Sequence, residues 1–148
     1  MRCALGVVSL AVFGCQGVPP APKSLDTRTP VALPPEAVEA VRLEMRTMLT
    51  SVDALHRALA TQDTALARRA AVASGLAAAA DPALEPLLPA EFLRLGITTH
   101  SAFDSLAVSL SARAPIDTML TRLSRITSNC VACHAIYRLV PAVAPPVS

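Results

Sequence analysis

The run Cys130-Val131-Ala132-Cys133-His134, near the C-terminus, constrains this chain more than any other stretch of it. A C-x-x-C-H run is typical of a site where c-type haem is attached: each thiol bonds to a haem vinyl group, and the imidazole becomes an axial ligand of the iron. On an α-helix, at about 100° per residue, the two cysteines and the histidine fall within one narrow sector. One planar cofactor can therefore meet all three side chains on one face of a helix.

A C-x-x-C pair has other uses, and the rest of the sequence has to separate them. A dithiol redox site is expected within a βαβ pattern, and a closed zinc site needs a second pair of ligands at suitable spacing. The other cysteines are Cys3 and Cys15, and the other histidines are the scattered His56 and His100. We therefore expect covalent haem attachment, with a structural or redox cysteine pair as the alternative.

The N-terminus has the features of an export signal. Arg2 precedes an apolar run from Ala4 to Phe13 that is too short to span a bilayer as a stable helix, so residues 1–14 are expected to be a signal peptide. Its end, Val12-Phe13-Gly14-Cys15, resembles a bacterial lipobox, which predicts lipid attachment at Cys15. Ordinary signal-peptidase cleavage and a buried N-terminal helix are the alternatives.

Export agrees with the haem interpretation, because c-type haem is attached outside the cytoplasm. The predicted location is the periplasmic side of a bacterial membrane, with a lipid anchor, or the soluble periplasm. A net charge of +2 over 148 residues gives no electrostatic argument for binding nucleic acid. This length suits one compact domain.

Prolines mark the expected boundaries of that domain. Six of them punctuate residues 15–35, which predicts an extended tether, and residues 141–148 are expected to form a disordered tail. Between these segments, residues 36–140 are expected to form an all-α, antiparallel four-helix bundle. The first helix should begin near Pro35 or Glu36, the second after Thr61-Gln62-Asp63, the third at Pro89, and the fourth after Pro115.

Apolar residues recur at three- and four-residue steps along each expected helix and predict its buried face. The four predicted faces are Val38, Val41, Met45, Met48, Val52, Leu55 and Leu59; Leu66, Ala70, Ala73, Ala77 and Ala80; Leu93, Ile97, His100, Phe103, Ala107 and Leu110; and Ile116, Met119, Leu123, Ile126, Cys130, Cys133 and Tyr137. Charged residues off the first face, including Glu44 and Arg46, are expected to be solvated. His56 should lie at the surface. The proline-rich segment Pro82–Pro89 should be a loop.

Four such helices, with the attachment run on the last, resemble the cytochrome c′ and cytochrome c-556 family of monohaem four-helix bundles. The run Cys130-Val-Ala-Cys-His134-Ala-Ile-Tyr137-Arg138 has the family's C-x-A-C-H-x-x-Y/F-R form. The resemblance implies thioether bonds at both cysteines, His134 as the proximal ligand, Arg138 one turn on near the proximal face or a propionate, and Tyr137 against the haem surroundings. Tyr137 is also well spaced for plain core filling.

The resemblance also directs attention to Met45 on the first helix. This residue falls near the position of a methionine ligand in c-556 members and of a blocking apolar residue in c′ members. Periodicity by itself places Met45 and Met48 only in the core. The sixth iron position could therefore belong to Met45, Met48 or His100, or be vacant. For His100 the favoured interpretation is a core-edge residue with a hydrogen-bond partner.

We therefore expect an electron-transfer haem protein rather than an enzyme, with iron bound by His134 and Met45 and with redox proteins of the cell envelope as partners. The first alternative is a five-coordinate cytochrome c′ that binds NO or CO. A peroxidase would need an acid/base group above open iron, and no Arg-His pairing supports one. A helical lipoprotein with a structural cysteine pair is the remaining alternative. Relatives of this family often dimerise, so the resemblance allows a homodimer, although the sequence itself does not determine the oligomeric state.

Overall fold

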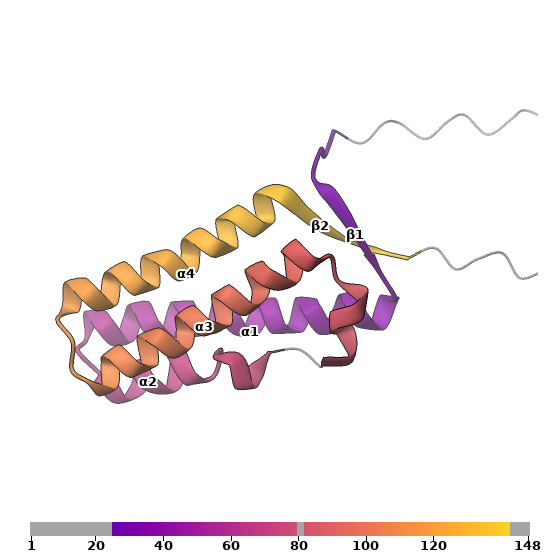
Figure 1. Ribbon diagram of the computed structural model, residues 1–148. Helices are drawn as coiled ribbons and strands as arrows, with labels where there is room; N and C mark the ends of the chain where they lie inside the picture. The colour runs from indigo at the N-terminus through magenta and orange to yellow at the C-terminus, as the bar shows by residue number, and fades with distance from the viewer. Residues whose placement is uncertain (1–24, 80–81, 143–148) are drawn as a thin grey trace, which may run out of the picture.

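The computed structural model describes residues 25–79 and 82–142, and most of them are helical. The helices are α1 (Pro35–Ala60), α2 (Thr64–Val72), α3 (Ala90–Ser111) and α4 (Ile116–Ile136), with short 3-10 helices η1 (Leu76–Ala78) and η2 (Pro82–Leu87) between α2 and α3. In Figure 1 the long helices lie side by side, and successive helices run back and forth along the molecule. The predicted all-α class is confirmed at this level.

Local sequence signals start each α-helix where they were expected to. Pro34, Pro89 and Pro115 occupy the N-cap positions of α1, α3 and α4, where a fixed φ and a missing N–H cost the helix nothing. At α2 the Asp63 carboxylate accepts a hydrogen bond of 2.8 Å from the Leu66 N–H. This bond satisfies one of the free donors at the start of the helix.

The second helix is shorter than predicted: it ends at Val72 instead of reaching Asp81-Pro82. Its buried residues are Ala67, Ala70 and Ala71. The predicted core positions Ala73 and Ala77 are exposed. The alanine-rich sequence favours helix, but contacts with α3 hold the following residues in another conformation.

Two contacts account for this early end of α2. The Ser74 carbonyl lies 2.8 Å from Nδ1 of His100, and the Asp104 carboxylate accepts a 3.0 Å bond from the Leu76 N–H. Gly75 lies against the same carboxylate so closely that a Cβ there would be 2.0 Å from Asp104 Oδ1. The close approach therefore requires glycine at this position.

A two-stranded parallel sheet is the main departure from the predicted architecture. Strand β1 (Thr29–Leu33) pairs with β2 (Tyr137–Pro141), with Thr29 opposite Tyr137 and Leu33 opposite Pro141. Part of the predicted tether is thus folded, and the fourth helix ends at Ile136 rather than near residue 140. The cause is burial, because Val31 and Leu33 are 2% and 0% exposed. Prolines are tolerated because both strands are edge strands.

The buried apolar residues form two separate cores. The first joins α1, α2, α3 and α4 and includes Leu55, Phe103, Leu106, Leu123 and Ile126. The second joins β1 to the beginnings of α1 and α3 and is formed by Val31, Leu33, Ala37, Val38, Val41 and Phe92. The predicted core positions Ile97 and Ile116 are wrong, since these side chains are 45% and 50% exposed.

The segments predicted to direct and anchor the protein lie outside the described residues. These are the signal peptide over residues 1–14, Cys15 as the predicted lipid attachment site, the part of the tether that precedes Leu25, and the tail from residue 143. In the described part of the chain, every helix is too short or too polar to cross a membrane.

Strand β1 should contribute directly to the stability of the domain. Leu33→Ala is expected to lower the free energy of unfolding by about 2–5 kcal/mol, because it opens a cavity in the second core. Urea unfolding followed by circular dichroism measures the change. Ala32→Ser, at an exposed neighbouring position of the same strand, is the control. Equal stability of the two variants would contradict the docking of β1.

Candidate functional site

The largest described cavity lies between α1, α3 and α4 and has a volume of about 560 Å³. Cofactor and ligand sites in proteins commonly have volumes of about 300–1,000 Å³. Most of the side chains that line it are apolar. They are Val41, Met45, Met48, Leu49 and Val52 of α1, Phe92, Leu95 and Gly96 of α3, and Cys130, Val131 and Cys133 of α4, with Glu44, Arg46, Thr99, Thr127, Asn129 and His134.

Helix α4 brings the two cysteines and the histidine of the attachment run to this cavity. Cys130, Cys133 and His134 all line it, as their spacing on a helix requires. Both cysteines are free thiols and half-buried, while His134 is exposed at the rim. Within the described part of the chain, neither nitrogen of the His134 ring has a hydrogen-bond partner, so the ring is available as a ligand.

The environment of the thiols disfavours a dithiol redox site. Burial raises the pKa of the Cys130 thiol, and burial together with neighbouring Cys130 raises the pKa of the Cys133 thiol. Reactive redox cysteines have lowered pKa values, which increase the fraction of nucleophilic thiolate. In the residues the structure describes, no three His, Cys, Asp or Glu side chains group together to hold a metal ion. A zinc site made by these side chains therefore gains no support.

Helix α1 supplies two thioethers to the same cavity. Met45 and Met48 are both partly buried and both line it. A methionine sulfur is an established axial ligand of haem iron in c-type cytochromes. The structure therefore brings four predicted site residues, Met45, Cys130, Cys133 and His134, to one cavity.

Tyr137 and Arg138, which were also predicted to lie near the haem, do not line the cavity. Helix α4 ends at Ile136, and both residues belong to β2. Tyr137 packs edge-on against Phe92, with ring centroids 5.5 Å apart and an interplanar angle of 80°. Phe92 lines the cavity, so Tyr137 supports its wall from the second core. Arg138 belongs to β2 and not to a further helical turn, which corrects its predicted placement.

Arg138 instead takes part in a charged group at the end of α4. Its Nε lies 3.8 Å from Asp26 Oδ2, and Asp26 also pairs with Arg28 at 2.7 Å. Hydrogen bonds from Arg28 lower the pKa of Asp26 to about 2. Nη1 of Arg28 donates a 3.4 Å hydrogen bond to the His134 carbonyl. The segment before β1 is thus joined to the histidine of the attachment run, a contact that no sequence pattern predicts.

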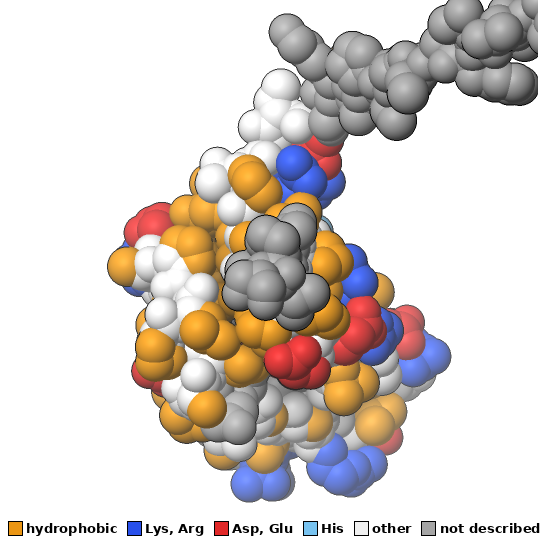
Figure 2. All heavy atoms as spheres, turned by 90° about the vertical axis from the view of Figure 1, so that its right-hand side faces the viewer, with side chains coloured by type: hydrophobic (Ala, Val, Ile, Leu, Met, Phe, Trp, Pro, Cys, Tyr) orange, Lys and Arg blue, Asp and Glu red, His pale blue; other side chains and the backbone are white. Residues whose placement is uncertain are grey.

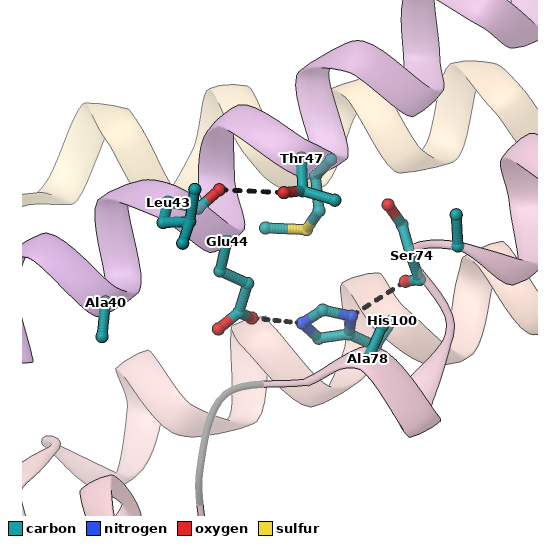
Figure 3. A pocket seen from close by; sticks show the side chains of 9 residues that line it. Ala40, Leu43, Glu44, Thr47, Ser74, Ala78 and His100 are labelled. Carbon is teal, nitrogen blue, oxygen red and sulfur yellow. Dashed lines mark hydrogen bonds and ion pairs between the residues drawn. The ribbon is translucent and has the colours of Figure 1, made fainter.

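His100 is held by hydrogen bonds and does not face the main cavity. It is 2% exposed, and Figure 3 shows its ring between Glu44 of α1 and the Ser74 carbonyl. Nδ1 lies 2.8 Å from Ser74 O, and Nε2 lies 2.5 Å from Glu44 Oε1. The predicted hydrogen-bonded core-edge histidine is confirmed. Because both nitrogens are engaged, neither is free to bind iron.

Glu44 is the site residue that the sequence analysis missed. It was expected to be solvated, yet its side chain is only 17% exposed and pairs with His100. A histidine on the buried face of α3 needs a polar partner. A search for an acidic residue near the middle of the facing helix could therefore have identified Glu44. His56, in contrast, is exposed as predicted, with Nδ1 2.8 Å from Val52 O.

The ring of His100 lies between two acceptors. Because a carbonyl can only accept, Nδ1 carries a hydrogen and donates it to Ser74 O. In the protonated ring, Nε2 also carries a hydrogen and donates it to the Glu44 carboxylate. The hydrogen bond to Glu44 raises the pKa of His100, and it outweighs the opposing effect of burial.

The raised pKa of His100 gives the stability of the protein a defined pH dependence. The extra stabilisation should be complete below the unfolded-state pKa of 6.5 and be lost as the pH rises through the higher folded-state pKa. Urea unfolding between pH 5 and pH 9 measures this loss, and ring NMR signals identify His100 as the titrating group. Glu44→Gln should weaken the dependence. A His100 that titrates below its ordinary range would contradict the pairing.

The function of the chain has to be inferred from these side chains, because the comparisons with known proteins give no other basis. No family model, curated protein or solved structure matches the chain. What the site can do follows from two thiols, one imidazole and two thioethers that share one largely apolar cavity.

Proposed function

We propose that the chain is a monohaem c-type cytochrome that carries electrons at the bacterial cell envelope, with its helices arranged as an antiparallel four-helix bundle around the haem. One observation carries the proposal. The residues of the C-x-x-C-H run and Met45, distant in sequence, line the same cavity of about 560 Å³. A structural cysteine pair would need neither the cavity nor the histidine.

The residues present suit a haem. Cys130 and Cys133 would form the thioether bonds, and His134, whose ring has no hydrogen-bond partner among the described residues, would be the proximal ligand. The lining is mainly apolar, as the face of a porphyrin requires. The two cores lie on either side of this cavity, and protein side chains do not fill the space between them.

Haem bound there would supply an iron atom that gains and loses one electron. The chain's own residues then determine how that iron behaves. A thioether from Met45 would occupy the sixth position, favour the reduced state and exclude small ligands. Leu49 and Val52 beside it would keep water from the porphyrin face. Such a closed site suits electron transfer better than ligand binding.

The setting of the protein is part of the same proposal. Lipid on Cys15 would anchor the chain on the periplasmic side of a membrane, and residues 16–28 would separate the anchor from β1. Its partners would be redox proteins of the envelope. Loss of the signal peptide removes Cys3 and lipid occupies Cys15, so Cys130 and Cys133 would be the two cysteines left for haem attachment.

Visible spectroscopy of the protein produced with a haem-maturation system tests the proposal. We expect low-spin spectra typical of methionine-ligated haem c, little response of the reduced protein to CO, and conversion by Met45→Ala to a high-spin form that binds CO. Met48→Ala, the neighbouring thioether of the same cavity, is the matched control and should keep the wild-type spectrum.

Each outcome of this experiment has a distinct meaning. A wild-type protein that is already high-spin and binds CO would favour the gas-binding cytochrome c′ alternative. Loss of the low-spin spectrum in Met48→Ala rather than Met45→Ala would move the sixth ligand one helical turn along α1. A protein without any haem spectrum would contradict the proposal.

A further inference from the structure

The middle of α1, beside the main cavity, contains no buried side chain. The buried residues of α1 are Ala37, Val38 and Val41 toward its start and Ser51, Leu55, Ala58 and Leu59 toward its end. Every side chain from residue 42 to residue 50 is at least partly exposed. Of this stretch, Met45 packs against the second core and Met48 against the first, and both are only partly buried.

Cavities flank this stretch on two sides. The main cavity lies toward α4, and a second cavity of about 260 Å³ lies toward α3 and the residues that follow α2. The second cavity is lined by Ala40, Leu43, Glu44, Thr47, Met48, Ala73, Ser74, Ala78 and His100 (Figure 3). Glu44 and Met48 line both cavities, so they form part of the wall between them.

A hydrogen-bonded pair of side chains connects the middle of α1 to α3. Glu44 Oε1 lies 2.5 Å from Nε2 of His100 on α3, and the two side chains are 17% and 3% exposed. The ring of His100 is fixed in turn by the 2.8 Å bond to Ser74 O. The Ser74 hydroxyl donates a further 2.8 Å bond to Ser51 Oγ of α1. One imidazole therefore joins α1, the segment after α2, and α3.

The other hydrogen-bonding side chains of this stretch do not substitute for Glu44. Among the described residues, Arg42 bonds to Glu39, Thr47 to the Leu43 carbonyl, and Thr50 to the Arg46 carbonyl, all within α1. Bonds within a helix do not determine how the helix is rotated about its own axis. The bond from Glu44 to α3 does.

We propose that the Glu44–His100 pair is a positioning element that sets the rotation of α1 and so directs Met45 into the main cavity. Met45 follows Glu44 by about 100° around the helix, so a Glu44 directed at α3 leaves Met45 facing the side of α4. The inference rests on the proposed function, since the sulfur it positions is the proposed sixth ligand. Neither Glu44 nor His100 touches iron in this account.

Substitutions of Glu44 in the full-length, haem-loaded protein test the inference. Glu44→Leu keeps much of the side-chain volume and removes the hydrogen bond, so the ratio of methionine-ligated to high-spin iron should fall on the order of tenfold. Glu44→Gln can donate an amide N–H to neutral Nε2 and should restore most of that ratio. Thr47→Ala, which lines the same second cavity but bonds only within α1, should leave it unchanged.

Hydrogen exchange of the same loaded proteins separates positioning from a general loss of stability. In Glu44→Leu, amide exchange should accelerate across residues 42–50 and stay unchanged in α3 and α4. A variant that is merely less stable would accelerate exchange throughout and keep its methionine-ligated spectrum well below the unfolding temperature. If Glu44→Leu does not fold, Glu44→Ala is measured in the same way.

The results distinguish the two proposals. A haem-loaded wild type whose methionine-ligated fraction is the same in Glu44→Leu and Thr47→Ala overturns the positioning role and leaves the cytochrome assignment intact. Failure of Glu44→Gln to restore ligation also overturns it. A wild-type chain that carries no covalent haem overturns the proposed function and the positioning role together.

Discussion

The central feature of the structure is a cavity between α1, α3 and α4 that the described side chains do not fill. Two apolar cores hold the helices at their ends, and between them α1, α3 and α4 line a cavity of about 560 Å³ that is open to solvent on one side. Apolar side chains at this cavity face water, including Leu49 at 67% and Val131 at 70% exposure, and apolar surface left in water is unfavourable. A planar apolar group that fills the space would remove this surface from water. The attachment run on α4 would hold it there by covalent bonds.

The short sheet gives this arrangement a closed end. Strand β1 lies beside β2, the strand that directly follows α4 (Figure 1). Val31 and Leu33 of β1 belong to the same core as Val38 and Val41 at the start of α1. The charged group formed by Asp26, Arg28 and Arg138 lies at the same end, where Arg28 bonds to the His134 carbonyl. Figure 2 views the molecule from the side that carries the sheet, where hydrophobic side chains and charged groups of both signs share the surface. The residues before α1 thus support the site and are not merely a connection to it.

Local chemistry made much of the fold predictable. Prolines at three helix starts and the capping carboxylate of Asp63 act on neighbouring residues, so the sequence alone locates those starts. The helical spacing of Cys130, Cys133 and His134 likewise fixes their common face. Met45 was placed in the core of the first helix by periodicity, and in a possible ligand position only by the family resemblance.

What the sequence did not reveal depends on contacts between distant segments. Pairing of β1 with β2 joins opposite ends of the chain, and no pattern within five residues predicts a parallel partner. The early end of α2 comes from bonds to His100 and Asp104 on another helix, which override a strong local preference for helix. Glu44 was assigned to solvent because its burial depends on a histidine across the gap.

Covalent attachment of haem to α4 is the central requirement of the proposed function. Mass spectrometry of the full-length chain, exported from cells that contain a haem-maturation system, measures it directly. The account predicts one haem per chain, recovered on the peptide that contains Cys130 and Cys133, and its loss when both cysteines are replaced by alanine. Recovery of that peptide with both sulfurs unmodified would contradict it.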